Sequence, residues 1–270
     1  MYRDFYQFKE LPFNMTADPE FFYSSNRHDE AFSHLVYGIE NRKGILVVTG
    51  EIGTGKTTLC RTLLSRLKSN IKTALVLNPY FSEIQLLQLI IDDLGIKGKF
   101  RNKLSLVNAL NEYLLEHSMQ GDNVVLIIDE AQNLRVRQLE QIRLLSNLET
   151  EKEKLLQIIL VGQPELLEKL KLSSLRQLNQ RVAVRYHILP LDKTEVQDYI
   201  YHRMRIASGA KNGKPVVKFS PEAIEAVYMY SQGTPRLINI LCDRALLSGF
   251  VKESREIDET TVVNCAREIG

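Results

Sequence analysis

Apolar residues gather in short segments that alternate with amphipathic ones. Residues 45–49, 73–77, 124–128 and 156–161 predict strands, and 183–189 predicts a fifth. The segments 124–128 and 156–161 are continuously apolar, which is typical of parallel strands covered on both faces. Between the strands, apolar residues recur at helical spacing in 82–94, 104–117 and 137–148. The alternation of strands and helices from 45 to 189 therefore predicts an α/β three-layer sandwich with a parallel sheet.

The two ends of the chain have different patterns. Residues 1–44 are rich in aromatics and contain Pro12 and Pro19, which predicts an irregular segment laid over a core, with a short helix at 29–39. After Pro190 the pattern predicts only helices. We therefore expect an α/β domain at 1–189, including the aromatic segment, and a small all-helical domain at 190–270.

Helix start signals support the helical C-terminal domain. Asp192 with Glu195 resembles a capping box, and Ser220-Pro221 and Thr234-Pro235 each place an N-cap residue before a proline at the first helical position. The polar, glycine-containing segment 209–215 predicts a loop between helices.

Composition restricts the function classes only slightly. The 270 residues carry a formal charge of +2 and 25% charged residues, which gives no sequence-level case for nucleic acid or a membrane surface as partner. The three cysteines, Cys60, Cys242 and Cys265, lack metal-ligand spacing and are expected to be small core residues. The N-terminus is polar, and no apolar run is long enough to span a bilayer. These features predict a cytoplasmic protein.

The segment after the first predicted strand matches the phosphate-binding pattern G-x-x-x-x-G-K-[ST]. It reads Gly50-Glu51-Ile52-Gly53-Thr54-Gly55-Lys56-Thr57, followed by Thr58. Glycines let successive backbone N–H groups face one point, and the following helix adds its N-terminal N–H groups. Lys56 would reach the β- and γ-phosphates, and the Thr57 hydroxyl would bind Mg²⁺.

Two carboxylates end the strand at 124–128. Asp129 would hold Mg²⁺ through water, and Glu130 would act as general base on the attacking water. An acidic strand terminus is by itself common, but it gains meaning beside a complete phosphate loop. A whole strand and two helices separate Lys56 from Asp129, and the base-reading N-K-x-D pattern is absent, so we expect ATP rather than GTP.

Further polar residues extend the predicted site. Gln163 follows the strand at 156–161 and is expected to sense the γ-phosphate; the alternative is a turn residue before Pro164. Arg236 lies in the first turn of a helix, where cations are disfavoured, and is expected to contact nucleotide phosphates rather than only solvent. Arg181 is the expected arginine finger for a neighbouring subunit, with Arg176 as the alternate, although arginines there are ordinarily solvated.

Together these residues resemble the AAA+ ATPases, a P-loop NTPase family. The phosphate loop, the Asp129-Glu130 pair, Gln163, the arginines before the last strand and Gly233-Thr234-Pro235-Arg236 occur in that order. Gln163 differs from the Asn, Ser or Thr common in the wider group.

A narrower resemblance covers nearly the whole chain. The motifs concerned are similar to the ATPase domains of the general secretion pathway protein A family and its pilus-biogenesis relatives: Pro12-Phe13, Asp18-Pro19-Glu20-Phe21-Phe22-Tyr23, His28-Asp29-Glu30-Ala31, Tyr37-Gly38-Ile39, Asn78-Pro79-Tyr80, Leu144–Leu148 with Glu149-Thr150-Glu151, Gly162-Gln163-Pro164-Glu165-Leu166 and Leu175-Arg176-Gln177-Leu178. The resemblance implies an Mg²⁺-dependent ATPase on the cytoplasmic side of a secretion or pilus system. It also implies a homo-oligomeric ring, a hexamer among the options, and a membrane-protein partner.

The same resemblance implies that His28 and Tyr37 lie near the adenine; the alternative is a role in the core alone. The family's membrane span and periplasmic domain do not follow residue 270, so we expect either a domain of a longer protein or a relative that needs a membrane partner in trans.

Two other function classes remain open at this point. Some transposition ATPases share this loop and lid, so a DNA-associated ATPase is one alternative, and the near-neutral charge argues against it. A nucleotide-gated switch with little hydrolysis is the other, and the intact Glu130 argues against it.

Overall fold

The computed structural model describes residues 1–77, 79–208 and 216–269. The chain divides into two compact units: unit 1 is Met1–Asn26, Gly53–Thr58 and Leu189–Gly270, and unit 2 is Arg27–Ile52 and Leu59–Ile188. These units do not follow the predicted domains 1–189 and 190–270 throughout, because residues 1–26 and 53–58 group with the C-terminal residues. The loop predicted at 209–215 lies outside the described residues.

Unit 2 is built on a five-stranded parallel sheet in which all five predicted strands are present. They are β1 (Ile45–Gly50), β2 (Ile71–Val76), β3 (Asn123–Ile128), β4 (Leu156–Gly162) and β5 (Val182–Ile188). Their order is β2-β3-β4-β1-β5, and every neighbouring pair is parallel. Every residue of β1, β3 and β4 is buried, as expected for strands with helices on both faces.

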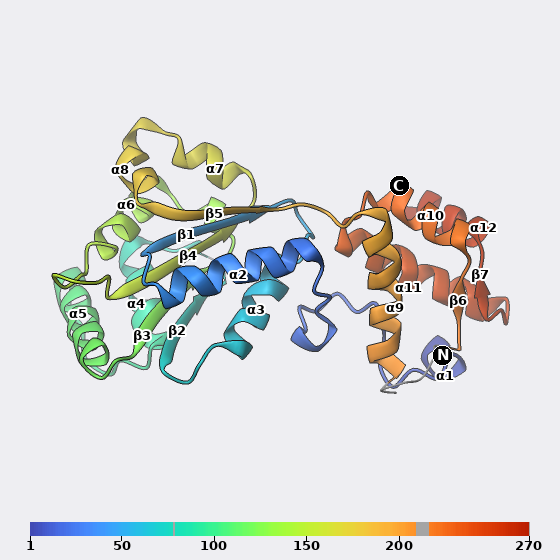
Figure 1. Ribbon diagram of the computed structural model, residues 1–270, viewed down its shortest axis with the longest axis horizontal. Helices are drawn as coiled ribbons and strands as arrows, with labels where there is room; N and C mark the ends of the chain where they lie inside the picture. The colour runs from blue at the N-terminus through green and yellow to red at the C-terminus, as the bar shows by residue number, and fades with distance from the viewer. Residues whose placement is uncertain (78, 209–215, 270) are drawn as a thin grey trace. The chain divides into compact units, whose positions relative to one another are not determined.

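Helices cover both faces of this sheet, so the predicted three-layer sandwich is confirmed. On one face lie α2 (Asn26–Glu40) and α3 (Lys56–Arg66) (Figure 1). A Cβ at Gly38 of α2 would lie 2.1 Å from a methyl carbon of Leu46 in β1, so only glycine allows this close packing. The loop that leads to α3 begins where β1 ends, at the carboxyl edge of the sheet.

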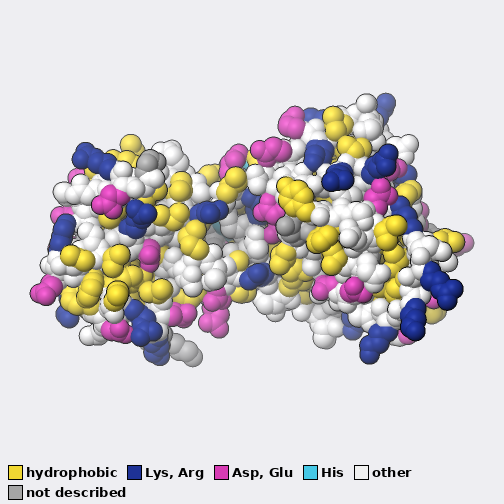
Figure 2. All heavy atoms as spheres, turned by 180° about the vertical axis from the view of Figure 1, so that it is seen from behind, with side chains coloured by type: hydrophobic (Ala, Val, Ile, Leu, Met, Phe, Trp, Pro, Cys, Tyr) yellow, Lys and Arg dark blue, Asp and Glu magenta, His cyan; other side chains and the backbone are white. Residues whose placement is uncertain are grey.

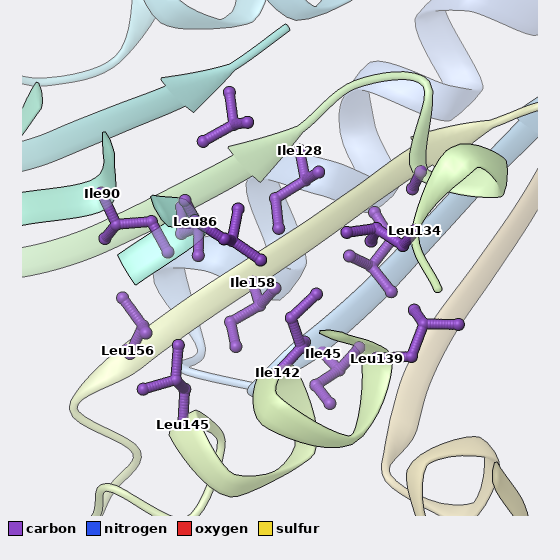
Figure 3. Packing of buried hydrophobic residues seen from close by; sticks show 14 of the residues in the cluster. Ile45, Leu86, Ile90, Ile128, Leu134, Leu139, Ile142, Leu145, Leu156 and Ile158 are labelled. Atoms are coloured by element: carbon purple, nitrogen blue, oxygen red, sulfur yellow. The ribbon is translucent and has the colours of Figure 1, made fainter. Parts of the chain in front are cut away.

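The opposite face carries the main hydrophobic core. It packs against α4 (Glu83–Asp93), α5 (Lys103–Met119), α6 (Val136–Leu145), α7 (Glu165–Leu170) and α8 (Arg176–Gln180). In Figure 3, Ile45, Ile128, Leu156 and Ile158 from the strands meet Leu86 and Ile90 of α4 and Ile142 and Leu145 of α6. Alternate residues of each strand point to this face, since side chains along a strand alternate between sides.

Unit 1 is helical, with α9 (Lys193–Ser208), α10 (Pro221–Ser231), α11 (Pro235–Val251) and α12 (Glu259–Ile269). The two-residue strands β6 (Lys218–Phe219) and β7 (Glu256–Ile257) pair in parallel, which corrects the expectation that no strand follows Pro190. Such short strands carry too few residues for a periodic signal.

The predicted helix starts in unit 1 are largely confirmed. Glu195 donates its backbone N–H to Asp192 Oδ1 over 2.9 Å, and Asp192 returns a bond to Glu195 Oε2 over 3.0 Å. Ser220 Oγ accepts from the Ala223 N–H at 3.0 Å. Thr234 precedes α11 as predicted, but its side chain makes no capping bond.

The N-terminal aromatic segment, with α1 (Tyr2–Phe5) and the 3-10 turn η1 (Pro19–Phe21), packs into the core of the helical unit. Tyr6 donates its hydroxyl to the Ser254 carbonyl at 2.9 Å. Arg203 of α9 is buried, and its guanidinium donates to the carbonyls of Pro12 at 2.6 Å and Asn14 at 3.0 Å. These bonds tie the segment to α9.

The cysteines, the hydropathy of the helices and the surface charges can be compared with the predictions from the sequence. Cys60, Cys242 and Cys265 are buried and unbridged, as expected of core residues. Of the helices that the structure describes, none has the length and hydropathy needed to cross a bilayer. On the face drawn in Figure 2, basic and acidic side chains are interspersed.

Candidate nucleotide site

The phosphate loop connects the end of β1 at Gly50 to the start of α3 at Lys56. Gly53 and Gly55 have φ angles of +83° and +91°, in the left-handed region that favours glycine. Left-handed residues alternating with right-handed ones turn successive N–H groups to one side and form an anion-binding concavity. Lys56 is buried at the first position of α3, where the N-terminus of the helix favours a bound phosphate.

The first turn of α11 packs directly on this loop within unit 1. The Arg236 N–H donates to the Gly53 carbonyl at 3.2 Å. A Cβ at Gly53 would lie 2.6 Å from the Arg236 Cβ, so a side chain there would push α11 off the loop. The predicted lid residue Arg236 therefore has its backbone beside the phosphate loop, while the contact of its guanidinium with phosphate stays a prediction.

The turn before α11 is fixed by a second glycine. Gly233 has a φ of +72°, and a Cβ there would lie 1.8 Å from the Leu191 carbonyl oxygen. Leu191 donates its N–H to the Gly233 carbonyl at 2.9 Å. The segment leading from β5 into α9 is thus bonded to the residue just before Thr234-Pro235-Arg236.

The acidic pair ends β3 at the carboxyl edge of the sheet. Asp129 is buried, its N–H donates to the Val76 carbonyl at 2.8 Å, and its Oδ1 accepts from the Glu130 N–H at 2.8 Å. Glu130 has a φ of +51°, which costs a non-glycine residue roughly 1 kcal/mol. Such strain at a strand terminus is common in catalytic sites.

The strand register brings these residues to the start of the phosphate loop. Ile128 of β3 stands opposite Leu160 of β4, and Gly162 of β4 stands opposite Thr49 of β1. The ends of β1, β3 and β4 therefore meet at one edge of unit 2. Ligands of open parallel sheets bind at this edge.

Two glutamine side chains meet the Glu130 carboxylate. Gln132 donates Nε2 to Glu130 Oε2 at 2.5 Å, and Gln163 donates Nε2 to the same oxygen at 3.4 Å. The Gln163 N–H also donates to Gln132 Oε1 at 3.0 Å. Gln163 thus lies beside the predicted general base, while its role as a sensor stays a prediction. Gln132 was not predicted from the sequence; its only signal is its place two residues after Glu130.

The candidate arginine fingers lie at the other edge of the sheet. Arg176 begins α8, Arg181 follows it, and both are exposed just before β5. Because β5 is parallel to β1, with Val182 opposite Ile45 and Ile188 opposite Gly50, Arg181 lies about 20 Å from the phosphate-loop end of the strand. Arg185, in β5, donates to the Asn179 carbonyl and side chain at 2.7 Å each.

The structure does not bring His28 and Tyr37 together. Both lie on α2, nine positions apart, so they are separated by about 13 Å along the axis and lie on opposite sides of the helix. His28 is buried, whereas Tyr37 is exposed with Lys43 Nζ 5.7 Å from its ring centroid. A contact of both side chains with one adenine is hard to reconcile with this spacing, and each assignment stays a prediction.

The oxygen donors in the site suit Mg²⁺ better than a transition metal. Thr57 offers a hydroxyl and Asp129 a buried carboxylate, which are hard ligands of the kind Mg²⁺ prefers. Among the described residues, no group of three or more His, Cys, Asp or Glu side chains could hold a metal ion. Mg²⁺ with few protein ligands is typically completed by water and substrate phosphates, and its binding by Thr57 and Asp129 stays a prediction.

Comparisons with known proteins find similarity along the whole chain. The protein family described as AAA domain matches residues 39–170. General secretion pathway protein A of Aeromonas hydrophila is 40% identical over 271 residues. The match covers all of this chain and 49% of the relative, so the chain spans about half the length of that curated protein.

Solved structures resemble the whole fold at low sequence identity. The ORC2 protein of Aeropyrum pernix, in its ADPNP-ADP complexes, has a TM-score of 0.70 at 16% identity. The match covers 96% of this chain and 72% of the ORC2 chain. Cdc6p of Pyrobaculum aerophilum has a TM-score of 0.69 at 19% identity, and the match covers 96% of this chain and 70% of the Cdc6p chain. The RuvB branch migration motor of Thermotoga maritima has a TM-score of 0.56 at 20% identity, and the match covers 90% of this chain and 69% of the RuvB chain.

Proposed function

Because the chain has the fold of AAA+ proteins, matches the AAA domain family over residues 39–170 and is similar over its whole length to General secretion pathway protein A, we propose that it is an Mg²⁺-dependent ATPase serving bacterial secretion. Its role would be to assist assembly of an envelope machine, such as a type II secretion secretin or a type IV-like pilus. The observation that carries the ATPase proposal is the meeting of the phosphate loop's start with Asp129 and Glu130 at one edge of the sheet.

Each residue of the site has a role in this proposal. Backbone N–H groups of Gly50–Thr58 would cradle the phosphates, and Lys56 would neutralise their charge. Thr57 and Asp129 would hold Mg²⁺, which supplies charge neutralisation at the β- and γ-phosphates when bound. Glu130 would accept a proton from the attacking water, with Gln163 beside it.

The position of Arg181 supports hydrolysis by an oligomer. At about 20 Å from the phosphate-loop edge of its own sheet, Arg181 cannot reach a nucleotide held there. A neighbouring subunit could present it in trans, as in other ring-forming ATPases. We therefore propose a homo-oligomeric ring in which Arg181, or Arg176, completes the site of the next subunit.

Hydrolysis is tested by comparing wild type with Lys56→Ala and Glu130→Gln. We expect Lys56→Ala to lose ATP affinity, and Glu130→Gln to keep affinity while the turnover rate falls at least about 100-fold, because the amide cannot take the proton. Steady-state phosphate release with Mg²⁺ and binding of a fluorescent ATP analogue measure the two effects. Phosphate release by wild type no faster than by Lys56→Ala would refute the ATPase proposal, whereas equal turnover in wild type and Glu130→Gln would refute only the role of Glu130 as general base.

The secretion role is tested in a bacterium that carries the chain and its secretin. Cells with Glu130→Gln should accumulate unassembled secretin, whereas wild-type cells form the assembled multimer, measured in outer-membrane fractions. Normal assembly in both would argue against this role. Adding duplex DNA to the ATPase assay at low and high salt separates the DNA-associated alternative, since phosphate contacts would make stimulation fall steeply with salt.

A further inference from the structure

The turn after Glu130 is held rigidly in place. It is the 3-10 turn η2 (Ala131–Asn133), and Lys169 of α7 donates its ammonium to the carbonyls of Gln132 and, at 2.9 Å, of Leu134. Gly162 at the end of β4 leaves room for this turn, since a Cβ there would lie 2.7 Å from Gln132 Oε1. The Gln132 side chain therefore has a defined place between β3 and β4.

The hydrogen bonds of Gln132 also define which way its amide faces. A backbone N–H can only donate, so the bond from Gln163 N–H at 3.0 Å requires the carbonyl oxygen of Gln132 at that end. The amide NH₂ must then face Glu130, where Nε2 lies 2.5 Å from Oε2. Gln132 is thus oriented as a hydrogen-bond donor to the carboxylate.

Both amide donors use the same carboxylate oxygen. Gln132 and Gln163 donate to Glu130 Oε2, at 2.5 and 3.4 Å, whereas Oε1 accepts no hydrogen bond from the part of the chain that the structure describes. The carboxylate is therefore anchored through one oxygen. Its other oxygen is left to contact a water molecule.

We propose that Gln132 is a positioning residue for Glu130, which it anchors through Oε2 so that Oε1 takes the proton of the attacking water. This inference rests on the proposed ATPase function. In the step concerned, the water oxygen bonds to the γ-phosphorus, the bond from that phosphorus to the β,γ-bridging oxygen breaks, and ADP leaves with the electron pair. The water proton passes to Glu130, so ATP and water give ADP and phosphate.

The test replaces Gln132 with residues of similar length. Gln132→Met removes the donor, and Gln132→Glu removes it while adding a negative charge beside Glu130. We expect kcat to fall about tenfold in the first and at least as far in the second, with KM and ATP affinity within about twofold of wild type, because Gln132 acts on the base and not on the nucleotide. Gln132→Asn, which keeps an amide, should retain part of the rate.

A neighbour in the same turn serves as the matched control. The Asn133 side chain accepts from the Tyr80 hydroxyl at 3.3 Å, and its only bond to Glu130 is from its backbone N–H to the Glu130 carbonyl at 2.9 Å, which Asn133→Ala keeps. Asn133→Ala should therefore keep the wild-type rate. Thermal denaturation of every variant shows whether it is folded. A rate loss in Asn133→Ala equal to that in Gln132→Met would mean that the turn, not the amide, matters, and would overturn the proposal.

A double-mutant cycle separates this inference from the proposed function. In the Glu130→Gln background, Gln132→Met should change the residual single-turnover rate less than about twofold, since its target is already inactive. A full tenfold loss there would overturn the positioning role. An unchanged kcat in both Gln132→Met and Gln132→Glu, with Glu130→Gln inactive, would overturn it while leaving the ATPase proposal intact. Turnover that is equal in wild type and Glu130→Gln would remove the general base and the positioning role together, and turnover of wild type no faster than that of Lys56→Ala would remove the ATPase proposal.

Discussion

His202 is a partly buried histidine at the boundary between α9 and the aromatic N-terminal segment. Its ring lies 5.6 Å from that of Tyr23, centroid to centroid, in an edge arrangement. Burial lowers its pKa below the ordinary 6.5, and the charges of Arg205 and Arg203 lower it further, against a backbone hydrogen bond at Phe22. The folded protein therefore favours the neutral ring.

This shift predicts that the stability of the protein depends on pH. As pH falls through about 6.5, the unfolded chain takes up the proton more readily than the folded one, so the contribution of His202 to stability is lost toward acid. His202→Phe keeps a ring against Tyr23 and removes the titration. We expect the Tm of wild type to fall relative to that of His202→Phe between about pH 7.5 and about pH 5.5.

Thermal denaturation monitored by circular dichroism checks this expectation. Both proteins contain the other titratable groups, so their effects cancel in the difference. A Tm difference that stays constant over the range would contradict the assigned cause.

At the scale of elements, Arg203 joins α9 to a segment about 190 positions earlier in the chain. Its guanidinium lies 4.8 Å from the Phe21 ring centroid and donates to Tyr199 Oη at 3.0 Å, in addition to the two carbonyls of the segment. Lysine cannot replace this arrangement, because it has neither the planar fork nor the stacking surface.

We therefore expect Arg203→Met to lower the free energy of unfolding by about 3 kcal/mol, because buried carbonyls lose a charged donor. Arg203→Lys should recover only a minor part. Urea unfolding measures the stability, and the rate of protease cleavage within residues 12–23 reports release of the segment. Arg205→Met, at an exposed neighbouring position, is the control. Equal stability and equal cleavage rates of the Arg203→Met and Arg205→Met proteins would contradict the proposal that Arg203 holds the segment against α9.

The elements themselves were largely predictable from the sequence, for identifiable physical reasons. Strands β1, β3 and β4 are buried on both sides, so their apolar runs are unambiguous, whereas β6 and β7 are too short for periodicity. The grouping of residues 1–26 with the C-terminal helices was not predictable, because a local sequence pattern does not indicate which distant helices an aromatic side chain packs against. The same limit hid Gln132, whose partner Gln163 is 31 positions away.

At the scale of the whole molecule, the separation of Arg181 from the phosphate-loop edge has a testable consequence for assembly. We expect specific ATPase activity to rise with protein concentration as subunits associate, and Arg181→Ala to lower the plateau at least about 100-fold while ATP affinity is kept. Mass photometry on the same samples follows the oligomer. Arg185→Ala, whose guanidinium is bonded to Asn179, is the matched control.

Mixing two inactive proteins gives the sharper form of this experiment. Lys56→Ala supplies Arg181 but has no working site, and Arg181→Ala has a working site but no finger. A mixed oligomer should recover activity, since one subunit completes the other. Activity that depends on neither concentration nor Arg181 would instead favour the monomeric nucleotide switch.

The discontinuous make-up of unit 1 also determines when it can form in a living cell. Tyr6 bonds to Ser254, so the aromatic segment emerges from the ribosome long before its partners exist. At roughly 5–20 residues per second, the intervening synthesis takes on the order of 10–50 s. During that interval the sheet of unit 2 can fold. The first aromatic residues stay exposed to solvent and are candidates for binding by chaperones. The phosphate loop can receive its contact with α11 only after residues 235–251 have been synthesised, so we expect shorter nascent chains not to bind nucleotide as the folded chain does.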